Sequence, residues 1–423
     1  MSTTNKRRHP SPDLSDSEDS TDTKLAILLS LHPSVALPTL LETLLASNGS
    51  VTAASSLLAA PPAKKQARQQ SSLSKFLQQP LSTSKPLRPP KKGETIHLYT
   101  PLSVSASLCP VTLLHSFLPP ALATSLLQEL LHESNTFAAP QSFRLFDREV
   151  TSPHTNGFFL RNPEVEANEY FSYQSRPLEA RPYTPSMLAA TQMVEAAVNS
   201  LLDARYGALR ENKPWGLSPQ PWSTNAALVN RYQGAKQAVG WHTDEVTYLG
   251  PMAVIAGLSL GVEREFRVRR MHPSDADKGG DPAKKGEERE SEGAYAVHLP
   301  HNSLVIMHPG MQEGWKHCVH PVNAVDLHPV AGDVRINITY RCYRRSLRPE
   351  LTPKCKCKLP MMMRAVFGPD PPDPDTPRKY FWTCAAPYRV DEGDGKGCSE
   401  FWWAEFDADG EPLWGEEKGE EKS

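Results

Sequence analysis

The segment WHTDE at residues 241–245 places an imidazole and a carboxylate two positions apart. On a β-strand, residues i and i+2 point to the same face, so His242 and Asp244 can present their ligand atoms to one point. A further histidine on a neighbouring strand would complete a set of two histidines and one carboxylate. Such a set leaves positions open on non-haem Fe(II) for O₂ and a cosubstrate. Many H-x-D pairs are surface polar pairs, so the motif needs support from other segments.

A second pattern is the segment RINITYR at residues 335–341, in which polar and apolar side chains alternate. As a strand it would place Arg335, Asn337, Thr339 and Arg341 on one face and an apolar row on the other. A solvated edge strand has the same pattern. If the polar face lines a cavity instead, its two guanidinium groups and its amide would form a receptor for a dicarboxylate. Upstream, Asn230 and Tyr232 alternate in the same way, and each adds a donor.

Four motifs follow one another along the chain: N-x-Y at 230–232, H-x-D-E at 242–245, W-x-H at 315–317 and R-x-N-x-T-x-R at 335–341. This order resembles the AlkB family of Fe(II)/2-oxoglutarate dioxygenases, in particular its eukaryotic nuclear branch that repairs alkylated DNA. The resemblance covers about residues 110–345. It implies that His317 is the third iron ligand, with His320 as the runner-up. It also implies a 2-oxoglutarate pocket formed by Arg335 and Tyr232 at the distal carboxylate, together with Asn230, Asn337 and Arg341.

The resemblance implies DNA repair by oxidative dealkylation of bases such as 1-methyladenine and 3-methylcytosine. The cosubstrate would lose CO₂ to give succinate, and the hydroxylated methyl group would leave as formaldehyde. The damaged base must leave the stack to reach the metal. It would then lie between His242 and Tyr173, with Glu245 accepting a hydrogen bond from its exocyclic amine. The wedge that fills the gap in the duplex is left open among Phe143, Phe146 and Phe158.

Four thiols near the C-terminus, Cys355, Cys357, Cys384 and Cys398, match the ligand count of a closed structural zinc site. The chain has 7 cysteines, an odd number that suits a reducing compartment better than a disulfide framework. The cysteine pattern, with aromatic residues at 380–382 and 401–403, resembles the GRF zinc-finger family. That resemblance implies single-stranded DNA binding through basic and aromatic side chains. The tryptophans that could stack on bases, some of which must instead form the module's core, are Trp382, Trp402 and Trp403.

Hydrophobic periodicity predicts helices over 121–133 and 186–206, and strands over 226–232, 253–260, 265–269, 295–299, 303–307 and 334–343. Many strands with few long helices favour a β-sandwich or jelly roll faced by helices. We therefore predict a mainly β fold with helices, and the AlkB resemblance implies that its core, residues 96–350, is the double-stranded β-helix of a dioxygenase. The charged, glycine-rich stretch 271–294 is expected to be an exposed insertion between strands.

The segments before the core differ in composition. Residues 1–23 read as disordered, and their basic run at 6–8 is a candidate nuclear-import signal. Residues 24–61 predict three short helices, and their Leu31-His-Pro33 and Leu57-Leu58 motifs resemble CUE/UBA-type ubiquitin-binding domains; a small bundle that only packs on another surface is the alternative. Residues 62–95 form a basic linker in which Gln70, Leu73, Phe76 and Leu77 resemble the box that binds the PCNA sliding clamp. The predicted GRF-type zinc finger spans residues 351–408, and residues 409–423 form an acidic tail.

The whole chain has 423 residues, with 46 Lys and Arg against 48 Asp and Glu. The resulting formal charge of −2 excludes a globally basic nucleic-acid coat but not a local basic stripe. No apolar run approaches the ~18 residues of a transmembrane helix, and the N-terminus has no secretory core. We expect a nuclear monomer that acts on alkylated DNA in single strands, duplexes or both. An RNA demethylase with the same chemistry is the alternative, and a non-catalytic nucleic-acid or ubiquitin adaptor is a third reading that predicts a broken ligand set.

Overall fold

The computed structural model describes residues 21–32, 35, 37–47, 50–59, 87–137, 142–145, 148–151, 154–162, 171–173, 176–271, 293–366, 376–388 and 397–414. The chain divides into two compact units, Met1–Phe76 and Leu77–Ser423. The predicted clamp-binding box, the basic run at 6–8 and most of the predicted insertion lie outside the described residues. Within the described ranges, no helix combines the length and apolarity needed to cross a membrane.

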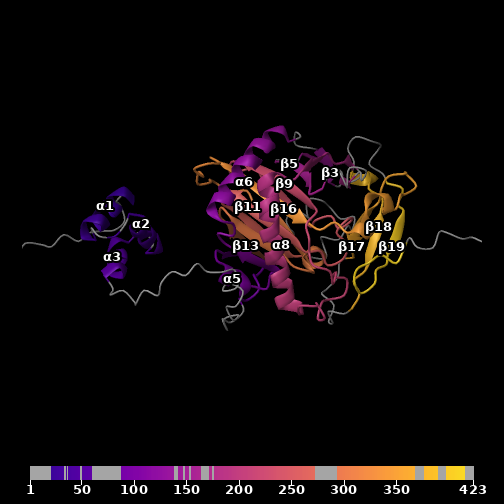
Figure 1. Ribbon diagram of the computed structural model, residues 1–423, viewed down its shortest axis with the longest axis horizontal. Helices are drawn as coiled ribbons and strands as arrows, with labels where there is room; N and C mark the ends of the chain where they lie inside the picture. The colour runs from indigo at the N-terminus through magenta and orange to yellow at the C-terminus, as the bar shows by residue number, and fades with distance from the viewer. Residues whose placement is uncertain are drawn as a thin grey trace, which may run out of the picture. The chain divides into compact units, whose positions relative to one another are not determined.

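The N-terminal unit is a bundle of the helices α1 (Thr21–Leu31), α2 (Leu37–Ala46) and α3 (Val51–Ala59) (Figure 1). Leucines one helical turn apart bring Leu28, Leu40 and Leu44 into its small core, together with Ala54. The leucine spacing predicted these three helices. His32, just after α1, is tied to α3 by a 2.8 Å hydrogen-bond contact between its Nε2 and Ser55 Oγ.

The larger unit contains two extended sheets. The five-stranded sheet has the order β1-β13-β12-β15-β10, and the seven-stranded sheet has the order β2-β14-β11-β16-β9-β5-β8. The strands of the first are β1 (Thr95–Leu98), β10 (Val239–His242), β12 (Arg264–Arg270), β13 (Ala294–Leu299) and β15 (Trp315–Val319). Those of the second are β2 (Val111–Leu114), β5 (Thr155–Leu160), β8 (Ala180–Pro182), β9 (Ala226–Gln233), β11 (Ile255–Gly261), β14 (Ser303–Met307) and β16 (Val334–Arg341).

Two helices cover the outer face of the seven-stranded sheet. In Figure 1, α6 (Pro120–Glu133) and α8 (Pro185–Tyr206) lie over strands β11, β16 and β9. Ile336, Ile338 and Tyr340 of β16 pack in the same core as these helices. A second core lies between the sheets and contains Ile255, Phe266 and Val297. The predicted mainly β fold with helices is therefore confirmed, and β16 is a central strand, not a solvated edge.

Several local signals fix where elements begin and end. Thr184 caps α8 by accepting a hydrogen bond from the Met187 amide at 3.3 Å, with Pro185 at the first helical position. Gly261 ends β11 with a φ of +88°, where an added Cβ would lie 2.2 Å from the Val334 carbonyl oxygen, so only glycine fits there. The predicted strand over 334–343 ends two residues early, at Arg341.

Shorter elements complete the unit. They are α5 (Pro101–Ser105), α10 (Met311–Gly314), the pair β3 (Ser142–Leu145) and β4 (Arg148–Thr151), the pair β6 (Ser172–Tyr173) and β7 (Arg176–Pro177), and the 3-10 turns Ser134–Thr136, Arg345–Leu347, Pro349–Leu351 and Ala386–Tyr388. A separate three-stranded sheet near the C-terminus has the order β17-β18-β19, formed by Met362–Ala365, Tyr380–Thr383 and Phe401–Ala404. It packs in one core with Val246 and Leu347 of the preceding segments.

Candidate active site

Two of the three predicted iron ligands face each other across neighbouring strands. His242 ends β10 and pairs in register with His317 on β15. Asp244 follows two residues later, and its Oδ1 lies 3.7 Å from His242 Nε2 and 3.3 Å from His317 Nε2. One ligand atom from each residue lies within 4.8 Å of the others. His320, the runner-up, lies just beyond the end of β15 and points its Nδ1 at the Pro321 carbonyl, 2.6 Å away.

The expectation that His242 and Asp244 share one strand is wrong. Strand β10 stops at His242, and Asp244 lies in the segment after it. The reason is that Asp244 bonds to residues outside the five-stranded sheet that contains β10. Its amide donates to Gln312 Oε1 at 2.8 Å, and its Oδ2 accepts from Arg341 Nη2 at 2.6 Å and Nε at 3.1 Å. These bonds orient the carboxylate so that Oδ1 is left for the two imidazoles.

The protonation states at this site suit metal binding. His242 Nδ1 lies 2.7 Å from the Gly240 carbonyl oxygen and donates to it, which leaves the Nε2 lone pair facing Asp244. Partial burial, with His317 nearby, lowers the pKa of His242 to about 4, so the ring is neutral at pH 7. Burial alone would raise the pKa of Asp244, but Arg341 and the two imidazoles outweigh it and hold that pKa well below its usual range. An anionic carboxylate and a neutral imidazole are the forms that bind metal ions.

A row of polar side chains runs along the inner face of β16. Arg335 is 1% exposed, and its Nε donates to Ser259 Oγ at 2.9 Å. Its Nη2 donates to Asn337 Oδ1 at 3.0 Å, and Asn337 Nδ2 donates to Thr339 Oγ1 at 2.9 Å. The remaining nitrogen, Arg335 Nη1, is buried and has no hydrogen-bond partner among the described residues. A buried guanidinium with one open donor fits an anionic ligand that the protein itself does not supply.

Tyr232 and Asn230 lie opposite this row on β9, paired with Arg335 and Asn337. The Arg335 guanidinium carbon lies 5.4 Å from the centre of the Tyr232 ring. Burial raises the pKa of Tyr232 to about 12, so its hydroxyl keeps its proton and can donate. Burial also lowers the pKa of Arg335 to about 10, which still leaves it charged at pH 7. The structure therefore brings four members of the predicted carboxylate receptor together on two paired strands, whereas the fifth, Arg341, bonds to Asp244.

Comparison with known families matches residues 110–341 to the 2OG-Fe(II) oxygenase superfamily. The chain belongs to this superfamily. The matched range contains the strands β10 and β15, which carry the two histidines, and the strands β9 and β16, which carry the predicted carboxylate receptor. The prediction of an Fe(II)/2-oxoglutarate-dependent dioxygenase is thus confirmed at the level of the family, and with it the jelly-roll core.

Curated relatives of this oxygenase include AlkB-type enzymes. The chain is 38% identical over 122 residues to the DNA oxidative demethylase ALKBH2 of Arabidopsis thaliana, covering 28% of this chain and 37% of the relative. It is 34% identical over 119 residues to the alpha-ketoglutarate-dependent dioxygenase alkB homolog 3 of Bos taurus, covering 28% and 36%. The chain thus spans little more than a third of the length of these relatives. Among solved structures, that of OsALKBH1 overlaps 55% of this chain and 98% of its own, with 16% identity and a TM-score of 0.34.

The residues present fit the groups that an oxygenase of this superfamily uses. Two imidazole nitrogens and one carboxylate oxygen are the donor set of non-haem Fe(II), and Arg335 Nη1 offers the open donor that a carboxylate of 2-oxoglutarate needs. Sequence patterns did not indicate Gln312, which holds the Asp244 backbone from α10. Nothing in the local sequence of α10 marks that contact, because it joins segments 68 residues apart.

We expect the substitution Arg335→Lys to raise the KM for 2-oxoglutarate by about 10- to 100-fold. A lysine keeps the charge but cannot donate to Ser259, Asn337 and a ligand carboxylate at once from a planar fork. The measurement is succinate formation as a function of 2-oxoglutarate concentration. Arg345→Lys, at an exposed arginine, is the matched control. An unchanged KM for 2-oxoglutarate in Arg335→Lys would show that Arg335 does not bind the cosubstrate.

Of the residues predicted to contact the base, the structure describes only some of the side chains. Tyr173 lies on β6, but its side chain is outside the described part. Glu245 is half-buried, and its Oε1 accepts from Thr247 Oγ1 at 2.6 Å. Phe158 is buried in a cluster with Phe171, which makes it a core residue and not an exposed wedge. The side chains of the other two wedge candidates, at 143 and 146, lie outside the described residues.

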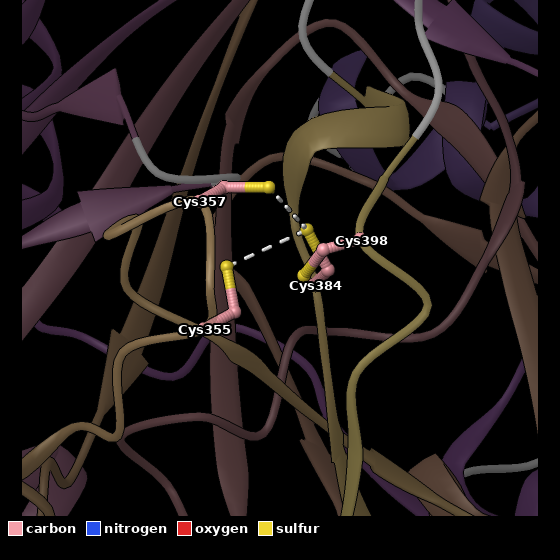
Figure 2. Close-up of side chains that lie close together, drawn as sticks. All are labelled: Cys355, Cys357, Cys384 and Cys398. Carbon is pink, nitrogen blue, oxygen red and sulfur yellow. Dashed lines mark hydrogen bonds between the residues drawn. The ribbon is translucent and has the colours of Figure 1, made fainter.

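The four C-terminal cysteines converge on one point, as Figure 2 shows. Cys384 Sγ lies 3.6 Å from Cys355 Sγ and 4.0 Å from Cys357 Sγ, and all four sulfurs, including that of Cys398, lie within 4.8 Å of one another. Thiolates at about 2.3 Å from a tetrahedral Zn²⁺ would lie about 3.8 Å apart. The spacing therefore fits a four-sulfur metal site. The other cysteines are free as well: Cys109 and Cys318 are buried, and Cys342 is partly so.

The cysteine-bearing module packs directly on the segment that carries Asp244. Val246, two residues beyond that ligand, shares a core with Cys355, Met363 and Trp382. Thr247 Oγ1 accepts from the Met363 amide of β17 at 3.2 Å. The module and the oxygenase sheets are thus joined next to Asp244, the predicted iron ligand, and not by a free linker.

A buried glutamate extends this junction. Glu313 of α10 is fully buried, and its Oε1 accepts from the Tyr380 hydroxyl at 2.8 Å and from the Met252 amide at 3.0 Å. Burial raises the pKa of Glu313. Tyr380 belongs to β18 of the module, whereas Gln312, next to Glu313, holds the Asp244 amide. Two side-chain contacts, made by the neighbouring residues Glu313 and Gln312, therefore link the module to Asp244, the predicted iron ligand.

Proposed function

We propose that this oxygenase removes alkyl groups from N-alkylated DNA bases, using Fe(II), O₂ and 2-oxoglutarate and releasing succinate, CO₂ and formaldehyde. The observation that carries the proposal is the convergence of His242, Asp244 and His317 beside a buried arginine with an open donor. The similarity to a protein named as a DNA oxidative demethylase supports the substrate class. Bases of the 1-methyladenine and 3-methylcytosine type fit best, because alkylation on the pairing edge makes extrusion from the stack less costly.

Iron and 2-oxoglutarate, when bound, supply the oxidising chemistry, and the chain supplies geometry. His242, Asp244 and His317 would hold the metal on one side and leave its other positions to ligands. Arg335, Tyr232 and Asn230 would orient the cosubstrate, with Asn337 fixing the Arg335 fork. Arg341 has a different place from the other pocket residues, since it bonds to Asp244 and so orients the carboxylate ligand.

Base recognition rests on His242, whose side chain is 37% exposed and so can be reached from solvent. We propose that the extruded base stacks between this ring and Tyr173. Glu245 would accept a hydrogen bond from the exocyclic amine of the base, which adenine and cytosine both carry. The carboxylate of Glu245 already accepts from Thr247, so its orientation is partly set before the base arrives.

Mass spectrometry of modified oligonucleotides tests this function. Single-stranded DNA and RNA of one sequence, each carrying 1-methyladenine or 3-methylcytosine, are incubated with the protein, Fe(II), ascorbate and 2-oxoglutarate. Loss of one methyl mass from DNA that requires 2-oxoglutarate is the expected result. Faster loss from RNA would make the protein an RNA demethylase. Succinate without base repair would refute dealkylation but keep the oxygenase, and no succinate would favour a non-catalytic adaptor.

We further propose that the four cysteines bind a structural zinc ion and that the module around them is a GRF-type finger that binds single-stranded DNA. Trp382 is 2% exposed and lies in the module's core, whereas Trp402 and Trp403 on β19 are 44% and 54% exposed. Lys379 lies with its Nζ 5.7 Å from the centre of the Trp403 ring. Exposed rings beside a cation are the usual means of holding single strands without sequence preference.

We expect Trp403→Ala to weaken binding of single-stranded DNA by about 5- to 100-fold, since one base–aromatic stack contributes about 1–3 kcal/mol. Fluorescence anisotropy of a labelled oligonucleotide measures the affinity. Leu209→Ala, at a leucine that is 86% exposed, is the control for loss of surface apolar area. Equal affinities of the two variants would place DNA binding elsewhere.

The remaining segments suggest recruitment. We propose that the N-terminal bundle binds ubiquitin as CUE-like domains do, that residues 70–77 bind the PCNA clamp, and that the protein acts as a monomer in the nucleus. Leu29 and Leu31 of α1 are 43% and 56% exposed and offer the apolar surface that such a bundle needs. These segments would bring the oxygenase to replication sites, where single-stranded, alkylated DNA is present.

A further inference from the structure

A second cluster of two histidines and one carboxylate lies on the five-stranded sheet. His97, His298 and Glu265 come from the adjacent strands β1, β13 and β12. Glu265 pairs directly with His298, and His97 pairs with Ala296, two residues earlier on the same strand. Because side chains alternate along a strand, all three point to one face of the sheet.

That face is opposite to the one that carries the iron ligand His317. The alternate residues Phe266, Val268 and Val297 are buried in the core between the sheets. Val268 pairs with His317 across β12 and β15, so His317 points inward with it. The cluster of His97, Glu265 and His298 therefore faces outward and is separate from the active site.

The ligand atoms of this outer cluster are close together. His97 Nδ1 lies 2.9 Å from His298 Nε2, and one ligand atom from each of the three residues lies within 4.8 Å of the others. A hydrogen bond between two neutral imidazoles would explain the first distance alone. It would not explain why a carboxylate completes the set on the third strand.

Neighbouring side chains prepare these atoms for a cation. His298 Nδ1 lies 2.9 Å from Glu263 Oε1 and donates to it, so the lone pair of His298 is on Nε2, the atom that faces His97. Glu265 Oε2 accepts from Arg267 Nε at 2.8 Å and Nη2 at 2.7 Å, which leaves Oε1 for a ligand. The Tyr99 ring stacks on His298 with centroids 4.0 Å apart and fixes the ring plane. Such carboxylate–histidine contacts behind the ligands are characteristic of metal sites.

We propose that His97, Glu265 and His298 bind one divalent transition-metal ion, with zinc as the best fit to two imidazoles and a carboxylate. Water would complete the coordination on the exposed side, next to His97. The ion ties the edge strand β1 to β12 and β13, which lie well over 100 residues away in the sequence. Bridging segments so distant in the sequence stabilises the folded chain, because the unfolded chain does not bring the ligands together.

The experiment counts zinc in the full chain carrying Asp244→Ala, which disables the iron site. Isothermal titration with Zn²⁺ and elemental analysis after dialysis compare this protein with versions that also carry His298→Ala, Glu265→Gln or His132→Ala. The first two should each bind one equivalent less than the parent. The last variant, at an exposed histidine on α6, should bind as much as the parent. Because the count is a difference between variants, it does not depend on whether the cysteine cluster is filled or on catalytic activity.

Thermal unfolding gives a second readout. Zn²⁺ should raise the Tm of the Asp244→Ala protein and should raise it less in the His298→Ala version. Because His298 and Glu265 face outward, their variants should fold. Far-ultraviolet circular dichroism of each variant checks this. Equal zinc counts in the parent, His298→Ala and Glu265→Gln proteins would overturn the site and leave a plain hydrogen bond between His97 and His298.

Discussion

Asp244→Ala is expected to lower the rate of 2-oxoglutarate turnover at least about 1000-fold, because the proposed Fe(II) site loses its only anionic protein ligand. The carboxylate lies within 3.7 Å of both imidazoles, and no other acidic group in the described residues completes this set. Fe(II) affinity should fall with activity. Both are measured on the purified protein, by succinate release and by metal titration in the absence of O₂.

Two further variants separate ligand loss from misfolding. Removing the carboxylate leaves the Arg341 guanidinium, 13% exposed, without its strongest partner, which can destabilise the fold by about 3–5 kcal/mol. Asp244→Asn keeps an acceptor for Arg341 and should retain the Tm while still losing most activity. Asp326→Ala, at an exposed aspartate, should keep full activity. A fully active Asp244→Asn protein would show that Asp244 is not an iron ligand.

Cys384→Ser is expected to remove the proposed zinc ion and to lower the Tm by more than about 5 °C. The binding free energy of a structural zinc ion is about 10 kcal/mol or more, and 1 kcal/mol corresponds to about 2–4 °C even in domains of about 150–250 residues. Cys384 is buried, and its Sγ lies 3.6 Å from Cys355 Sγ and 4.0 Å from Cys357 Sγ. The oxygenase should lose about 10- to 100-fold in activity as well, the usual effect of removing support behind a metal ligand. The physical reason is that Val246 and Thr247, just beyond Asp244, pack on this module.

Zinc content, Tm and Fe(II) affinity are measured for Cys384→Ser beside Cys342→Ser, a thiol outside the cluster. Tyr380→Phe tests the contact between the module and the oxygenase sheets separately from zinc binding. It deletes only the hydroxyl that bonds to Glu313 and leaves all four cysteines in place. It should keep its zinc and still bind Fe(II) more weakly. A zinc-free Cys384→Ser protein with unchanged Fe(II) affinity would mean that the module is an independent appendage.

The sequence indicated the elements whose signal is local. Alternation of polar and apolar residues along 335–341 predicted a two-faced strand, and the apolar residues of β16 do pack in the core while the polar row faces inward to the site. Side-chain direction on a strand depends only on position, so this inference needs no knowledge of neighbours. The same logic failed between His242 and Asp244, because the end of a strand is set by the contacts that compete for its backbone. Here Gln312 takes the Asp244 amide.

Strand register is what brings His317, and not His320, opposite His242. The motif resemblance favoured His317, but the pairing of β10 with β15 is a long-range property that spacing alone does not specify. Which of the tryptophans are buried and which are exposed is likewise set by long-range pairing. Trp382 is buried and Trp402 and Trp403 are exposed because β18 lies between β17 and β19, with one face against Val246 and its neighbours.

By itself the sequence determined the class of fold, the order of the motifs and the types of donor available for metal and carboxylate. These follow from periodicity and residue chemistry, which act over a few residues. Only the tertiary structure decided that Tyr380 reaches Glu313 and that His97, Glu265 and His298 meet on one face. Those contacts join residues 33 to 201 positions apart. The first forms because the C-terminal module packs on the oxygenase sheets, and the second because β1, β13 and β12 pair side by side in one sheet.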